Sequence, residues 1–134
     1  YKSPDSVNAI DWSLKQKNAD LFQYYQELIK LRKEHPAFRM KTAGDVERHL
    51  VFDKKENRPG VITYMLKDNA NGDSWKEIML VFNGNDAPVD VNVPKADWLV
   101  VAQDGRLVAK GFGKSSGGKM SVAPCSALIL AREK

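Results

Sequence analysis

The amino-acid sequence predicts a mainly β protein, an antiparallel sandwich of about eight strands that follows one long helix. The first observation is that residues 18–39 repeat their apolar side chains with the 3.6-residue period of a helix. The second is that the period changes to two from His49 onward, with turn residues between the apolar runs. A chain of 134 residues, of which 43% are hydrophobic, is long enough to bury a core.

The opening segment, residues 1–17, is rich in Ser, Pro, Asp and Asn. These residues favour turns because their side chains bond to nearby backbone groups, so the segment is expected to be an irregular loop. Val7, Ile10 and Trp12 are apolar anchors within it. A loop with such anchors is typically docked on a larger body, yet little in the rest of the chain is suited to receive it.

The predicted helix carries an unusually broad apolar face. Leu21, Tyr25 and Leu28 form a stripe that Phe22 and Ile29 widen. The stripe covers more than half of the circumference, so the helix is expected to need a partner surface on two sides.

The ends of the helix are also predicted from the sequence. Asn18 or Asp20 is expected to cap its first backbone N–H groups. Pro36 is expected to end it, because proline has no N–H and pushes His35 out of the helical conformation. Further on, Thr42 followed three residues later by an acidic residue matches a capping box and predicts a short helical turn.

The β-rich part is divided by turn signals. Residues 68–74 and 111–118 are expected to be loops, Asp104 with Gly105 predicts a tight hairpin, and Pro124 with Cys125 predicts a corner. The nearly continuous apolar run at residues 77–83 predicts a central strand covered on both faces. The expected strands are residues 49–53, 60–67, 77–83, 89–93, 98–102, 106–109, 119–122 and 127–132.

Charge and composition exclude several classes of protein. The net charge is +4 with scattered lysines, which indicates a solvated surface and no nucleic-acid partner. No apolar run is long enough to predict a membrane span. The one cysteine excludes an internal disulfide and leaves the compartment open, either cytoplasmic or exported in a bacterium. Because the sequence opens at Tyr1 within an expected loop, we expect it to be a fragment.

The sequence predicts no metal site and no cofactor. His35 and His49 have no cysteine or carboxylate companions at ligand spacing. Cys125 is expected to be a packed thiol, since no basic partner that would activate it is identifiable. The glycines of residues 111–118 lack the Lys-Ser/Thr ending of a phosphate-binding loop.

Two features could bind sugar. Asn8 and Asp11, beside Trp12, could share hydrogen bonds with paired sugar hydroxyls while the indole lies on the sugar's apolar face. The alternative is that both side chains only fix the backbone of their loop. Trp75 ends a polar loop, where an exposed indole could form a sugar platform, whereas Trp98 lies in a strand and is expected in the core.

Two stretches near the start carry a resemblance to a known family. SPDSVNAIDW at residues 3–12 and LIKLRKEHPAFR at residues 28–39 resemble the end of the catalytic domain of type I pullulanases. These are starch-debranching members of the α-amylase superfamily, glycoside hydrolase family 13. LVFNGNDAPVDVNVP at residues 80–94 and APCSALILARE at residues 123–133 resemble the C-terminal β-sandwich of the same enzymes.

The resemblance implies a division of the chain. Residues 1–40 would be the last loop and last helix of a (β/α)8 barrel, and residues 41–134 the C-terminal sandwich. The missing barrel would be the partner of the broad apolar face; without it, self-association through Leu21, Phe22, Tyr25 and Leu28 is expected. The resemblance does not decide whether the complete enzyme, of which this chain would be a part, binds calcium.

The resemblance also implies an activity for the parent. Such enzymes hydrolyse α-1,6 linkages of pullulan and branched dextrins with retention, through an Asp nucleophile and a Glu acid/base that lie upstream of this segment. The fragment is therefore expected to be non-catalytic and inactive, with Asn8 and Asp11 at the rim of the cleft that holds the α-glucan. The alternatives are a carbohydrate-binding module that holds α-glucan through Trp75 or another exposed aromatic, and a protein-interaction sandwich.

Overall fold

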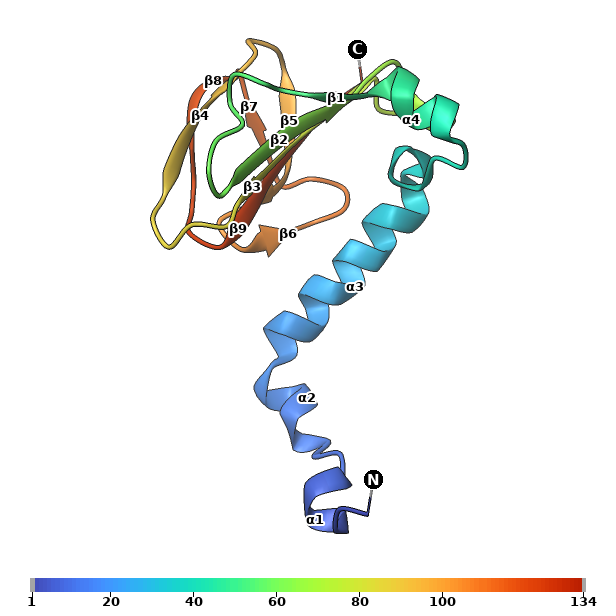
Figure 1. The fold of residues 1–134 in the computed structure, drawn as a ribbon, viewed down its shortest axis with the longest axis vertical. Helices are drawn as coiled ribbons and strands as arrows, with labels where there is room; N and C mark the ends of the chain where they lie inside the picture. The colour runs from blue at the N-terminus through green and yellow to red at the C-terminus, as the bar shows by residue number, and fades with distance from the viewer. Residues whose placement is uncertain (1, 134) are drawn as a thin grey trace.

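The computed structural model describes residues 2–133. A long helical N-terminal part leads into a β-rich body (Figure 1). The helices within the described residues are α1 (Asp5–Asn8), α2 (Ser13–Lys17), α3 (Ala19–Glu34) and α4 (Ala43–His49), with 3-10 turns η1 (Pro36–Arg39) and η2 (Ala70–Gly72). The strands there are β1 (Leu50–Phe52), β2 (Val61–Leu66), β3 (Glu77–Asn83), β4 (Val89–Val93), β5 (Trp98–Gln103), β6 (Arg106–Leu107), β7 (Gly113–Ser115), β8 (Gly118–Val122) and β9 (Ser126–Arg132).

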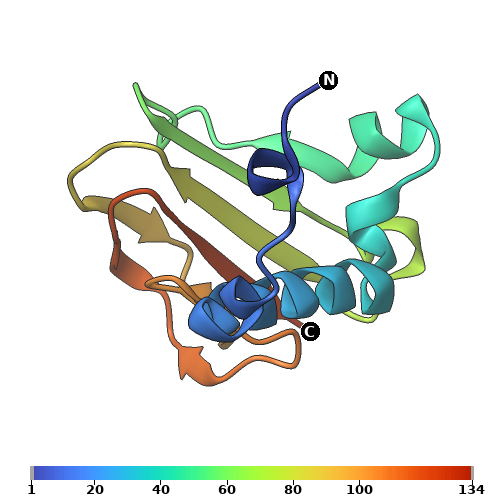
Figure 2. The same cartoon turned by 90° about the horizontal axis from the view of Figure 1, so that it is seen from below.

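The strands form two antiparallel sheets, which confirms the predicted sandwich. The larger sheet has the order β1-β2-β3-β9-β5-β6, with β7 also paired to β5. The smaller sheet consists of β4 and β8. It covers one face of the larger sheet, while the helical segment lies on the other side (Figures 1 and 2).

Strand β3 is central and covered on both faces, as its apolar run predicts. Ile78 and Leu80 belong to the core cluster on the helix side of the sheet. Met79 and Val81 point the other way, into the cluster that includes Val91 of β4. Strands alternate their side chains between faces, so a strand buried on both sides has no polar positions in its middle.

A buried amide joins the two sheets. Asn83, at the end of β3, is 2% exposed. Its Nδ2 group donates to the carbonyl oxygens of Ala87 at 2.9 Å, Val122 at 3.2 Å and Ala123 at 2.9 Å. Its Oδ1 accepts from the backbone N–H of Asn85 at 3.0 Å. The side chain therefore satisfies backbone groups at the point where the chain crosses between the sheets.

α3 packs on the sheet through one face, from Tyr24 onward. Leu31 is 3% exposed, and Tyr24 and Leu28 lie against the same helix-side cluster. Leu28 is therefore not on the bare face where the sequence pattern placed it. The first turns of α3, with α2 and α1, project away from the β-rich body (Figure 1).

Several local predictions are confirmed and others are wrong. Thr42 caps α4 through its Oγ1, which accepts from the backbone N–H of Asp45 at 3.1 Å. Asn18 precedes α3 without a side-chain capping bond; its Nδ2 donates back to the carbonyl of Leu14 at 3.0 Å instead. Cys125 is exposed rather than packed, because it forms the corner before β9 with a positive φ of 46°.

Two segments expected to be irregular contain secondary structure. Residues 1–17 hold the short helices α1 and α2, and residues 111–118 hold β7, whose backbone pairs with β5. Loops were predicted there from the polar composition. Composition carries no information on backbone pairing with strands that are distant in the sequence. Among the described residues, no helix combines the length and the apolar character that crossing a bilayer requires.

We predict that Leu31→Ala lowers the free energy of unfolding by about 2–5 kcal/mol, because it empties a core site beneath α3. Leu21→Ala, the same change in the same helix, is the matched control. Leu21 is 54% exposed, so its truncation is expected to cost less than about 0.5 kcal/mol. Urea denaturation measures both; equal losses would show that α3 does not pack on the sheet as described.

Candidate functional site

A buried carboxylate lies at the junction of α3 with the β-rich body. Asp73 is 3% exposed. Its Oδ1 lies 2.9 Å from Nδ1 of His35 and accepts from the backbone N–H of Trp75 at 2.9 Å. Its Oδ2 accepts from the backbone N–H of Ala37 at 3.0 Å. One side chain therefore joins the end of α3, the turn η1 and the segment that leads into β3.

The ring of Trp75 completes this junction and is not exposed. It is 5% exposed and stacks on the His35 ring, with centroids 3.3 Å apart and planes 13° apart. The expectation that Trp75 is exposed is therefore wrong, and its buried indole offers no open face as a sugar platform. Trp98 is in the core as predicted, and its Nε1 donates to the carbonyl of Pro94 at 2.8 Å.

The polar loop beside the junction also binds η1. Asn71 has a left-handed φ of 54°, a conformation that asparagine tolerates better than most residues. This places its Nδ2 2.9 Å from the carbonyl of Pro36 and 3.3 Å from that of Arg39. Residues 68–74, predicted as a flexible loop, therefore hold the α3–η1 turn in place.

A second contact fixes α3 farther from its end. Oε2 of Glu27 accepts from the backbone N–H of Ala109 at 2.7 Å, just after β6. The turn itself is held by Arg39, whose Nε donates to the carbonyl of Arg32 at 2.7 Å. With Asp73 at one end and Glu27 nearer the middle, the C-terminal half of the helix has a defined orientation on the sheet.

Asn8 and Asp11 lie in the N-terminal segment that projects from the body. Asn8 ends α1, and its Nδ2 donates to the carbonyl of Ser3 at 2.7 Å. Asp11 precedes α2, and its Oδ1 accepts from the backbone N–H of Ser13 at 2.9 Å. Hydrogen bonds from the side chain and backbone of Ser13 lower the pKa of the Asp11 carboxyl. Both residues are exposed and both fix local backbone, so a role in sugar binding stays a hypothesis.

The projecting segment and the outer face of α3 that continues it present a series of bare apolar side chains. We call residues 5–29 the N-terminal arm. An exposed apolar surface on this scale typically marks an interaction site, since soluble proteins rarely leave large apolar patches in water. The exposed large apolar residues of the arm are Val7, Ile10, Trp12, Leu14, Leu21, Phe22, Tyr25 and Ile29.

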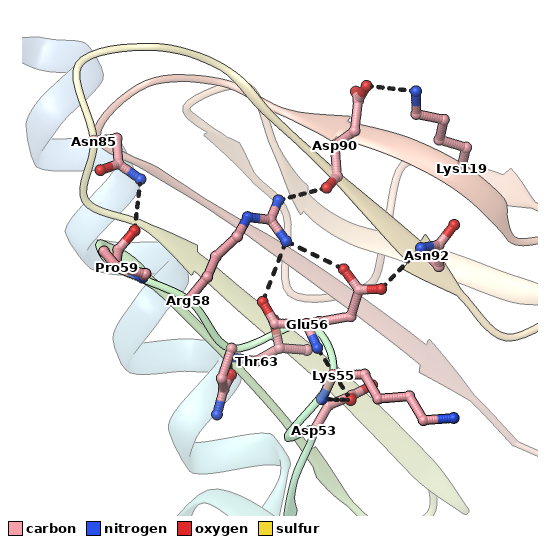
Figure 3. A network of polar contacts seen from close by, with 11 residues as sticks. Asp53, Lys55, Glu56, Arg58, Pro59, Thr63, Asn85, Asp90, Asn92 and Lys119 are labelled. Atoms are coloured by element: carbon pink, nitrogen blue, oxygen red, sulfur yellow. Dashed lines mark hydrogen bonds and ion pairs between the residues drawn. The ribbon is translucent and has the colours of Figure 1, made fainter.

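A polar network on the other side of the molecule is structural (Figure 3). Glu56, 8% exposed, accepts from Nδ2 of Asn92 at 2.9 Å and pairs with Nη1 of Arg58 at 3.4 Å. Nη2 of Arg58 donates to the carbonyl of Asp90 at 2.6 Å. Both Glu56 oxygens therefore have partners, and the network ties the β1–β2 connection to β4. The ion pair of Asp90 with Lys119 raises the pKa of the lysine.

The described residues contain no cluster of three or more His, Cys, Asp or Glu side chains suited to hold a metal ion. The features that remain are the bare apolar arm and the rigid junction that orients it. An exposed apolar arm of this kind is suited to bind another apolar surface.

Comparisons with known proteins converge on one family. The family described as "Pullulanase, all-beta domain" matches residues 46–106. The curated pullulanase of Bacillus subtilis (strain 168) is 37% identical over 95 residues, which is 70% of this chain and 13% of that protein. This chain therefore spans only a small part of its relative.

Solved structures match nearly the whole chain. The pullulanase from Bacillus acidopullulyticus has a TM-score of 0.89 at 37% identity, over 98% of this chain and 16% of that one. The type I pullulanase from Bacillus subtilis complexed with maltose has a TM-score of 0.83 at 27% identity, over 98% and 18%. The Anoxybacillus sp. LM18-11 pullulanase complexed with maltotriose has a TM-score of 0.80 at 29% identity, over 97% and 17%.

We predict that Asp73→Ala lowers the free energy of unfolding by about 2–4 kcal/mol, because it leaves buried donors without an acceptor. The exposed Asp86 provides the control Asp86→Ala, for which a change within about 0.5 kcal/mol is expected. Urea denaturation followed by tryptophan fluorescence measures both. A loss for Asp73→Ala no larger than the control's would contradict a central role for this carboxylate.

Proposed function

We propose that this chain, whose residues 46–106 are homologous to the all-β domain of pullulanases, is a non-catalytic, structural flank of a starch-debranching glycoside hydrolase. The observation that carries the proposal is the match of 98% of this chain to 16% of the Bacillus acidopullulyticus enzyme. The parent would hydrolyse α-1,6 linkages of pullulan and branched dextrins.

The chemistry would lie outside this chain. A retaining mechanism needs a nucleophilic carboxylate and an acid/base carboxyl about 5 Å apart. We place that pair in the barrel, upstream of these residues. What this chain contributes is a folded sandwich that covers an apolar side of the barrel and a junction that fixes the last barrel helix at a defined angle.

The proposal divides the chain at residue 40. Residues 1–40 would complete the barrel with its last loop and helix, and residues 41–134 would form the sandwich. Two observations support this division. The arm leaves Trp12 and Tyr25 exposed, and another face of α3 packs through Leu31 onto the β-rich body. A helix with one bare face and one packed face is suited to lie between two bodies.

The partner within the cleft would be an α-glucan. Related pullulanases have been crystallised with maltose and maltotriose. We place Asn8 and Asp11 at the rim of the cleft, where both side chains would contact the glucan. Their exposure and their position on the projecting arm support this placement. The alternative of a carbohydrate-binding module built on Trp75 has no support, because that ring is buried.

The chain alone is expected to release no reducing sugar from pullulan, because it lacks the paired carboxylates.

A chimera in which this chain replaces the matching segment of the Bacillus acidopullulyticus pullulanase is expected to hydrolyse pullulan. In it, Asn8→Ala and Asp11→Ala should raise KM about 2–10-fold, the effect of one lost hydrogen bond each. The control is Asp5→Ala, which removes another exposed carboxylate of the arm. Hydrolysis by the isolated chain would refute the proposal.

Without the barrel, the bare face of the arm should make the chain self-associate as its concentration rises. Phe22→Ser and Tyr25→Ser are expected to weaken this association, whereas Gln23→Ser, an exposed polar position on the same helix, should not. Sedimentation velocity measures all three. A monomer at every attainable concentration would show that the face needs no partner.

A further inference from the structure

The larger sheet has an apolar patch that neither α3 nor the smaller sheet covers. Its exposed members are Phe52, Ile62 and Phe82, which are 54%, 52% and 40% exposed, and Tyr64 lies half-buried between them and the core. Phe52 pairs with Tyr64 across β1 and β2, and Ile62 pairs with Phe82 across β2 and β3. We call these four residues the aromatic patch.

The rings of the aromatic patch form a continuous row. The Phe52 and Tyr64 centroids are 5.8 Å apart in an edge arrangement, and those of Tyr64 and Phe82 are 6.1 Å apart and stacked. Such pairs pre-organise a rigid apolar surface, because each ring limits the rotamers of the next.

The patch is continuous with the surface on which α3 packs. Alternation along β2 places Ile62, Tyr64 and Leu66 on one face of the sheet. Leu66 is buried in the helix-side cluster and Tyr64 packs against that cluster, while Ile62 is bare. Burial raises the pKa of Tyr64, in keeping with its place at this border. One sheet face is therefore covered at one end and open at the other.

We propose that the aromatic patch docks the apolar face of a second helix of the catalytic barrel, one that lies beside α3 in the parent enzyme. This inference rests on the proposed function, since it takes the partner from the same polypeptide. The matched pullulanases leave ample chain for it, because the segment that corresponds to this chain is only 16–18% of those structures.

The position of α3 leaves this part of the sheet open. α3 contacts the edge strand β6, and Glu27 bonds to Ala109 just after that strand (Figure 2). The aromatic patch lies on β1, β2 and β3, toward the opposite edge in the order β1-β2-β3-β9-β5-β6. A second helix on the patch would therefore lie on the same face of the sheet as α3.

The chemistry of the patch favours a helix over a glucan. Three of its four side chains carry no polar atom, so they cannot bond to sugar hydroxyls. A sugar site combines ring faces with convergent hydrogen-bonding groups. Aromatic and branched aliphatic side chains instead match the leucine-type ridges of an amphipathic helix.

Cysteine labelling tests the proposal. Ile62→Cys and Phe82→Cys are made one at a time in a Cys125→Ser background, because Cys125 is itself exposed. Each is measured in the dilute isolated chain and in the chimera with the Bacillus acidopullulyticus barrel. A maleimide should react roughly tenfold or more slowly in the chimera, because the docked helix shields the thiol. Ser121→Cys, exposed on β8 of the smaller sheet, is the control and should react equally in both.

A reporter on the arm separates this inference from the proposed function. Tyr25→Cys should be protected in the chimera if α3 joins the barrel at all. Protection at position 25 with full reactivity at 62 and 82 would overturn the docking of a second helix and leave the proposed function intact. Full reactivity at all three positions would overturn both. Protection at 62 and 82 that appears only with added maltotriose would identify a glucan surface and overturn the inference.

A second measurement serves if the chimera does not fold. The unlabelled cysteine variants of the chain are mixed with a Bacillus acidopullulyticus enzyme from which the matching segment has been removed, and maleimide is then added. Protection of positions 62 and 82 on mixing, with position 121 unchanged, supports the docked helix. Protection of position 25 alone on mixing contradicts it.

Discussion

The orientation of α3 on the β-rich body depends on the buried carboxylate of Asp73. A buried acceptor is strongly destabilising unless donors surround it, and here the donors come from two separate parts of the chain, residues 35–37 and residue 75. The His35 ring, the first turn of η1 and the backbone of Trp75 all converge on it. All three groups bond to the same carboxylate, so a shift of Asp73 would break every one of these hydrogen bonds. The end of α3, the turn η1 and the start of β3 are therefore held in one arrangement. The direction of the N-terminal arm then follows from the direction of α3.

The sequence predicted the parts of this fold that local periodicity determines. The run that became β3 and the capping residue Thr42 are readable because neighbours in the chain decide them. Trp75 was placed wrongly because its surroundings in the chain are polar, whereas its burial is decided by His35, which lies 40 positions earlier in the chain. β7 was missed for a related reason: its short polar segment becomes a strand only through pairing with β5. The candidate site residues Asn8 and Asp11 were found through their types, and their local bonds fit either interpretation.

The arm and the aromatic patch share one property, which is that each exposes apolar side chains on an ordered part of the fold. The patch is held by cross-strand ring pairs, and the end of α3 from which the arm extends is held by the Asp73 junction; neither set of contacts involves a partner. A rigid surface loses little conformational entropy when a partner covers it, so a given apolar area yields more binding free energy. Under the proposed function, a sandwich built in this way would contribute to an enzyme without carrying its chemistry, because it would fix the angle of the helix that joins it to the catalytic domain.

The amide of Asn83 has a consequence for the chemical lifetime of the protein. The residue precedes Gly84, and asparagine is among the residues that limit survival at high temperature. In the folded state its Nδ2 group is engaged by three carbonyl oxygens. Conversion of the amide to a carboxylate would replace that donor with an acceptor facing those carbonyls, so a molecule altered during transient unfolding would be unable to rebuild the crossing between the sheets. Deamidation of Asn83 in the unfolded state would therefore make an otherwise reversible unfolding event irreversible.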